Sequence, residues 1–102
     1  MTIRASNCQL LDQIAEFVVP RLSADYRAGL LVNPESLTPY LAIFGGPRFK
    51  THLIIAKAPG RELTARESNF GTWCLMHAAA GWCCVRSVSD AEKALIHWGI
   101  CQ

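Results

Sequence analysis

Lys57 is the clearest candidate for a chemical role in this sequence. It follows the apolar run His52–Ala56, which is typical of a buried strand. In strands that carry out phosphodiester chemistry, such a lysine stands two residues after a carboxylate. Alternate residues of a strand share a face, so both groups reach one phosphate, where lysine orients water or stabilises developing charge. Here Ile55 occupies the position two residues before Lys57. The sequence therefore raises the question of whether a metal is bound beside this lysine.

Two apolar runs joined by a glycine–proline turn predict the strands that position Lys57. Residues 40–44 and His52–Ala56 are continuously apolar, and the connection between them begins with Gly45-Gly46-Pro47. Continuous apolarity is typical of strands that are covered on both faces. We therefore expect a hairpin with helices packed on it.

Capping boxes and glycines indicate the helices around this hairpin. We expect a leading helix over residues 6–20, a long helix that begins at Thr64 and ends by Gly81, and a last helix from the box Ser89–Glu92 to Gly99. The remaining predicted elements are a helical turn over 23–28, a short strand over 30–32 and a strand over 82–88. This order predicts an α/β sandwich with a small mixed sheet flanked by helices (α-β-β-β-α-β-α).

Length and composition predict one folded domain. The chain has 102 residues, 51% of them hydrophobic, and a net charge of +2, which is too small to indicate a nucleic-acid partner by itself. The five cysteines lack the spacing of a zinc or redox motif, which favours reduced thiols. No run reaches the roughly 18 apolar residues of a membrane span, and no signal-peptide pattern is seen. We expect a cytoplasmic protein that does not enter a membrane.

Three segments together resemble the virus-type replication-repair nuclease family (VRR-NUC), a branch of the PD-(D/E)XK nuclease superfamily. They are TPYLAIF, LIIAKAPGRELTARE and AAAGWCCVRSVSDAEKAL, found between Thr38 and about Gly99. In the family, a strand beginning with Pro-Asp is followed by a strand ending in Glu-x-Lys. A Pro-Gly-Arg turn then leads into a helix starting Leu-Ser-x-x-Gln, which is followed by a glycine, a strand ending in Val-Arg-Ser and a final helix. The resemblance implies a PD-(D/E)XK nuclease-like sandwich, a single VRR-NUC-like domain over 1–102 with its core at 30–99.

The resemblance also implies that the metal ligands of the family are replaced in this chain. Tyr40 stands where the aspartate is expected and Ile55 where the glutamate is expected, and neither side chain is a credible magnesium ligand. Lys57 is then a vestige of the catalytic trio. Glu67 stands at the family's glutamine and is a candidate for a ligand moved onto the helix, although a capping box with Thr64 is the favoured interpretation. We expect no metal site and no cofactor, with Mg²⁺ only in a rearranged active site.

Basic residues flank the strand that leads to Lys57 and are the candidates for contact with nucleic acid. Solvated loop charge is the alternative interpretation of the same residues. The candidates are Arg48, Lys50, Lys57, Arg61 and Arg66.

We therefore expect a catalytically degenerate, phage-derived nuclease-fold protein that binds nucleic acid or a host or phage nucleic-acid-processing protein. Small stand-alone members of the resembled family tend to dimerise, so a homodimer fits, and interference with a host nucleic-acid-targeting system is one such role, by analogy of fold. An active Mg²⁺-dependent, structure-specific DNA endonuclease and a protein-only adaptor or inhibitor are the alternatives.

Other reactive residues give weaker signals. The three histidines are too far apart in sequence for local metal spacing, and Cys74 and His77 share a helix face without any sign of an oxyanion hole. The three tryptophans could stack on bases, but their spacing favours core packing. For the long helix, we expect a buried face made of Phe70, Trp73, Cys74 and His77.

Overall fold

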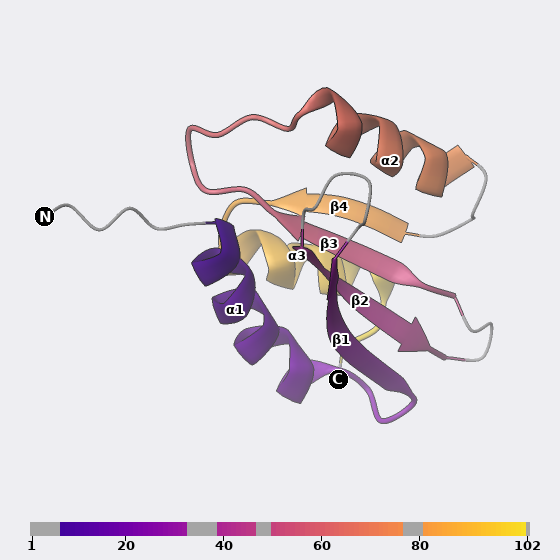
Figure 1. The fold of residues 1–102 in the computed structure, drawn as a ribbon. Coiled ribbons are helices and arrows are strands. Elements are labelled where there is room, and N and C mark those ends of the chain that lie inside the picture. The colour runs from indigo at the N-terminus through magenta and orange to yellow at the C-terminus, as the bar shows by residue number, and fades with distance from the viewer. Residues whose placement is uncertain (1–6, 33–38, 47–49, 77–80, 102) are drawn as a thin grey trace, which may run out of the picture.

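A four-stranded mixed sheet with the order β1-β2-β3-β4 is the centre of the fold (Figure 1). The computed structural model describes residues 7–32, 39–46, 50–76 and 81–101. The first three strands are antiparallel neighbours, and β4 runs parallel to β3. The strands are β1 (Tyr26–Val32), β2 (Pro39–Gly45), β3 (His52–Ala56) and β4 (Gly81–Val85). The small mixed α/β fold expected from the sequence is confirmed at this level, including the hairpin and the helical crossover.

Within these described ranges, three α-helices cover the two faces of the sheet. The helices α1 (Asn7–Val18) and α3 (Val88–Trp98) contact each other and share one face, whereas α2 (Ala65–Met76) lies on the opposite face over β4 (Figure 1). A short 3-10 helix, η1 (Val19–Arg21), continues α1 where Pro20 removes a backbone donor. Within the described residues, no helix has the length and apolarity to cross a membrane.

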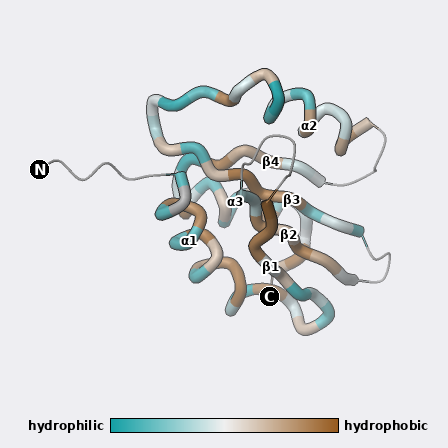
Figure 2. Tube along the Cα trace, in the orientation of Figure 1, coloured by the Kyte–Doolittle hydropathy of each residue, from teal (hydrophilic) through white to brown (hydrophobic). Residues whose placement is uncertain are grey.

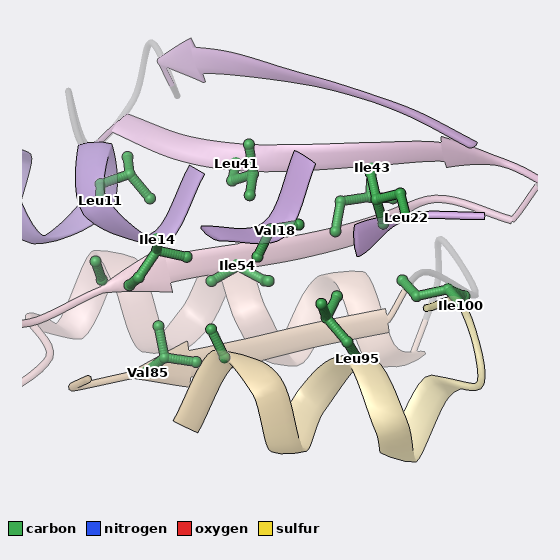
Figure 3. Close-up of a cluster of buried hydrophobic side chains, with 12 residues drawn as sticks. Leu11, Ile14, Val18, Leu22, Leu41, Ile43, Ile54, Val85, Leu95 and Ile100 are labelled. Carbon is green, nitrogen blue, oxygen red and sulfur yellow. The ribbon is translucent and has the colours of Figure 1, made fainter. Parts of the chain in front are cut away.

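The main core lies between the sheet and the pair α1 and α3 (Figure 3). Alternate residues of each strand point into it, so that Leu41, Ile43 and Ile54 meet Ile14 of α1 and Leu95 of α3. All five are at most 1% exposed. Burial of such side chains is the main driving force for this arrangement.

The other face of the sheet has a smaller core under α2. Ala42, Leu53 and Cys74 are buried there, with Tyr40, Phe70 and Trp82 packed around them. Figure 2 shows that β1 and β2 are largely hydrophobic, whereas α2 and the segment before it are more hydrophilic. The core under α2 is therefore the smaller of the two, and the candidate site lies on this face.

Two local predictions are wrong. Residues 23–28 were expected to form a helical turn, but Tyr26 already belongs to β1 and pairs with Gly45, because the ladder with β2 extends through the whole strand. The capping box expected at Ser89–Glu92 is shifted. Instead Ser87 is the N-cap of α3, and its hydroxyl accepts a hydrogen bond from the Asp90 N–H.

The ends and the buried face of the other helices differ in part from expectation. Trp73 was expected in the core but is 55% exposed, whereas Cys74 is buried as expected. His77 lies outside the described residues. The long helix was predicted to end by Gly81, and residues 77–80, where that end was expected, are also outside them. Ser6 also lies outside the described residues, and α1 begins at Asn7. Gly99 ends α3 in the left-handed conformation, as its position predicted.

A buried lysine–glutamate pair at the candidate functional site

Lys57 and Glu67 form a buried ion pair on the α2 face of the sheet. The Lys57 Nζ atom lies 2.7 Å from Glu67 Oε1, and the two side chains are only 8% and 2% exposed. Lys57 directly follows β3, and its backbone N–H donates to the Val85 carbonyl of β4 at 3.0 Å. Strand alternation places its side chain on the same face as Leu53 and Ile55. The lysine therefore reaches α2 rather than solvent.

Glu67 is held by the capping box that the sequence predicted. Its backbone N–H donates to the Thr64 hydroxyl at 3.2 Å, and its Oε1 accepts from the Thr64 N–H at 2.8 Å. This reciprocal arrangement starts α2 at Ala65. The same carboxylate oxygen thus caps the helix and neutralises Lys57, so the two interpretations of Glu67 are not exclusive.

Tyr40 and Ile55 occupy this face beside the ion pair. Leu41 pairs with Ile54 and Ala42 with Leu53, so the next pair in this antiparallel register is Tyr40 and Ile55. On its other side, Ile55 pairs with Cys84 of β4. The Tyr40 ring packs on Phe70 of α2, with 6.0 Å between the ring centroids. Ile55 is 5% exposed. The two positions where carboxylates were expected are therefore neighbours, and they are filled by packed side chains that carry no carboxylate.

The turn after Lys57 is fixed by two side chains distant in sequence. Asn7 Oδ1 accepts a hydrogen bond of 2.7 Å from the Ala58 N–H, and Arg86 Nη1 donates to the carbonyls of Ala58 and Arg61. The Arg61 N–H closes the turn on the Ala58 carbonyl at 3.1 Å, with Gly60 at a positive φ of 85°. The conformation that presents Lys57 to Glu67 is thus held from α1 and from the end of β4.

Sequence reasoning missed the roles of Asn7 and Arg86, and it missed the ion pair itself. Arg86 belongs to the Val-Arg-Ser motif that supports the family resemblance, so its presence was noted without a partner. Asn7 was interpreted only as part of a helix start. One signal in the sequence could have predicted the pair. A single lysine next to an apolar strand needs a counter-charge if it is buried, and the nearest candidates are the glutamates that follow it.

The predicted nucleic-acid-binding residues do not all lie together. Lys50 is exposed before β3, whereas Arg61 and Arg66 are exposed after it. Lys50 and the turn after Lys57 lie at opposite ends of β3, roughly 20 Å apart at a strand rise of about 3.3 Å per residue. Lys57 between them is buried in its pair with Glu67, and Arg48 lies outside the described residues.

Cysteine and histidine chemistry is weakly supported at this site. Burial raises the pKa of the Cys74 thiol, and burial likewise raises the pKa of Cys84 despite the opposing charges of Arg86 and Lys57. A raised pKa disfavours the nucleophilic thiolate. In the part of the chain that the structure describes, no three His, Cys, Asp or Glu side chains are grouped so that they could hold a metal ion.

Comparison with known proteins leaves the family open. Searches of protein-family models, curated proteins and solved structures returned no match for this chain. The mixed sheet, the three helices and the buried pair are properties of the chain itself. The nuclease-like interpretation of its motifs remains a prediction based on the residues quoted above.

Proposed function

We propose that this protein has a PD-(D/E)XK nuclease-like fold whose metal site has been replaced by the Lys57–Glu67 pair, and that it acts by binding a partner. The observation that carries the proposal is the 2.7 Å contact between the two charges, both buried beneath α2. A lysine that stabilises a phosphorane must reach the phosphate. Here its ammonium already faces a carboxylate.

The surroundings of the pair support a binding role over hydrolysis. Mg²⁺ is held by hard oxygen ligands with near-octahedral geometry, whereas Ile55 offers none and Tyr40 packs against Phe70. In water-excluded surroundings, a paired lysine and glutamate stabilise each other, and separating them for catalysis would leave two buried charges without compensation. The replaced positions and the pair therefore favour the same conclusion.

An active nuclease is the second candidate, and one observation favours it. Glu67 places a carboxylate within 2.7 Å of Lys57, so a carboxylate and a lysine are again adjacent on this face, with the acid supplied by α2. A metal site built on Glu67 would need further oxygen ligands from solvent or substrate. Under this alternative, Glu67 would hold the cation, which would activate water, and Lys57 would orient that water.

A cleavage assay separates the two candidates. Branched and nicked DNA duplexes are incubated with the purified protein and Mg²⁺ or Mn²⁺, beside the matched variant Glu67→Gln, which keeps the capping box. Binding without catalysis predicts no cleavage above that of the variant. Metal-dependent cleavage that is lost in Glu67→Gln would support the active nuclease.

The dependence of DNA binding on salt concentration tests whether the partner is a nucleic acid or a protein. If phosphates are bound through exposed residues such as Lys50, Arg61 and Arg66, retention on DNA falls with salt along a log–log slope proportional to the number of phosphate contacts. No retention on DNA even at low salt would favour a protein partner. Interference with a nucleic-acid-processing assembly is compatible with either kind of partner.

A further inference from the structure

The outer edge of β4 has backbone groups directed away from the sheet. The Gly81 N–H donates to the Thr51 carbonyl at 2.9 Å, and the Val85 carbonyl accepts from the Lys57 N–H at 3.0 Å, so these residues of β4 point toward β3. Backbone groups alternate in direction along a strand. The N–H and C=O groups of Trp82 and Cys84 therefore point to the open side, where the described sheet has no further strand.

This open edge is bounded by α3. The next outward-pointing donor, the Arg86 N–H, is bound by the Asp90 carboxylate at 3.1 Å, at the start of α3. The stretch that remains for pairing is the centre of β4, from Trp82 to Cys84, where the Cys84 carbonyl also accepts a long contact of 3.7 Å from the Cys83 thiol. Its length suits a short extended segment, since two outward-facing residues can exchange hydrogen bonds with one added strand.

A groove of about 910 Å³ follows this edge between α2 and α3. Its α2 wall carries Leu75, which is 58% exposed, and its α3 wall carries the exposed residues Lys93 and His97. Figure 1 shows β4 as the edge strand of the sheet, with α2 along it. One wall is therefore apolar and the other polar and basic.

The charge of the groove favours an acidic occupant. Its lining includes the exposed Lys50 and Lys93, against the carboxylate of Asp90, while the guanidinium of Arg86 donates to the turn after β3. That carboxylate already accepts the Arg86 N–H. An occupant with acidic side chains would gain from complementary charge, chiefly in association rate and specificity.

The tryptophans of the groove favour a peptide over stacked bases. The Trp82 ring is so close to α2 that a Cβ on Gly71 would lie 2.7 Å from it, and the Trp98 ring packs on His52 at 4.7 Å between centroids. Base stacking needs a free aromatic face. Because the protein already covers one side of each ring, the two tryptophans offer less stacking surface than free rings would, which favours backbone pairing with β4.

We propose that the β4 edge binds an extended acidic segment of a partner protein as a fifth strand. Side chains of such a strand alternate between the two faces, so apolar residues would face Leu75 on α2 and acidic residues would face Lys93 on α3. The inference rests on the proposed binding function and names its partner class: a peptide in which acidic and apolar residues alternate.

The test uses a fluorescein-labelled peptide of about nine residues with alternating Glu and Val, long enough to span one strand. Its binding to the full chain is followed by fluorescence anisotropy, beside a peptide of the same composition with Glu and Val in separate blocks and a labelled oligothymidine of similar length. Cys84→Pro removes an outward-pointing N–H without breaking the ladder with β3, and Cys84→Ala is its control. Lys93→Glu reverses a charge in the groove, and Arg27→Glu reverses one on β1, the opposite edge strand.

We expect the alternating peptide to bind the full chain, and we expect Cys84→Pro and Lys93→Glu each to raise its dissociation constant about tenfold. The control variants Cys84→Ala and Arg27→Glu should leave the dissociation constant unchanged. Circular dichroism confirms that each variant is folded, and Lys93→Glu keeps the test decisive if Cys84→Pro unfolds. The inference would be overturned if the block peptide bound as tightly as the alternating one, or if Lys93→Glu and Arg27→Glu weakened binding equally. It would also be overturned if only the oligothymidine bound, or if nothing bound. None of these outcomes involves cleavage, so the proposed loss of catalysis is judged separately.

Discussion

Lys57 Nζ and Glu67 Oε1 lie 2.7 Å apart, with both side chains almost fully buried between β3 and α2. Lys57 directly follows β3, and Glu67 lies in the first turn of the crossover helix α2, ten positions later in the chain. The contact therefore ties the start of α2 to the sheet.

Removing only one charge of this pair should destabilise the fold more than removing both charges. Lys57→Met leaves the Glu67 carboxylate buried without its cation, which is expected to lower the free energy of unfolding by about 3–5 kcal/mol. The double variant Lys57→Met/Glu67→Gln is neutral and keeps the capping box, so most of this loss should be recovered. Urea unfolding of the single and double variants measures the difference. A double variant as unstable as Lys57→Met would contradict the account.

Restoring the expected carboxylates should create a metal site beside Lys57. Tyr40→Asp/Ile55→Glu places two acids opposite each other on neighbouring strands, where Cβ atoms lie about 5 Å apart. We expect calorimetric Mg²⁺ binding and a rise in melting temperature with Mg²⁺, because the cation relieves the repulsion between the acids. The uncharged pair Tyr40→Asn/Ile55→Gln is the control. If the folded acidic variant does not respond to Mg²⁺, positions 40 and 55 are not the sites of lost ligands.

The protein should lose stability as the pH falls below about 6.5, in part through His52. Burial lowers the pKa of His52, and Lys50 acts in the same direction. Its Nδ1 atom has no hydrogen-bond partner among the described residues. The unfolded chain therefore binds a proton that the folded protein resists, and the free energy of unfolding decreases by up to about 1.4 kcal/mol per pH unit.

His52→Gln isolates this contribution. Between pH 7 and pH 5, as a working range around the ordinary histidine pKa, the variant should show a flatter dependence of unfolding free energy on pH than the parent chain. Parallel curves for the two proteins would show that His52 is protonated equally in the folded and unfolded states.

Gly71→Ala should destabilise the protein although alanine is the better helix former. A Cβ at this position would lie 2.7 Å from the Trp82 ring, so α2 or the indole must move. Overpacking outweighs the propensity gain of about 1 kcal/mol, and we expect a net loss of about 1–2 kcal/mol in thermal or urea unfolding. Gly29→Ala, where an added Cβ meets nothing within 4 Å, controls for the chemical change. An increase in stability for Gly71→Ala would mean that α2 is not packed closely on β4.

The elements predicted correctly are those whose signal is local. The apolar run before Lys57, the Thr64 capping box and the terminating Gly99 each determine structure through neighbours within a few residues. The β1 strand was only partly predicted, because Tyr26–Ala28 become extended through pairing with β2, a contact that their own sequence does not encode.

The candidate site was less predictable because its contacts are long-range. Asn7 bonds Ala58 from a position 51 residues away, and Arg86 bonds the same turn from 28 residues away. The pairing of Lys57 with Glu67 depends on how α2 crosses the sheet. Trp73, expected to be buried, is exposed because α2 presents Cys74 and Gly71 to the sheet instead.

Metal-dependent cleavage of branched or nicked DNA is the measurement that tests the central claim most directly. The parent chain and the folded variant Glu67→Gln are compared at equal concentration with Mg²⁺ and with Mn²⁺. Because Lys57 is neutralised and Tyr40 and Ile55 replace the expected ligands, the account predicts no cleavage by the parent chain above that of the variant. Cleavage by the parent chain that requires the cation and disappears in Glu67→Gln would contradict it.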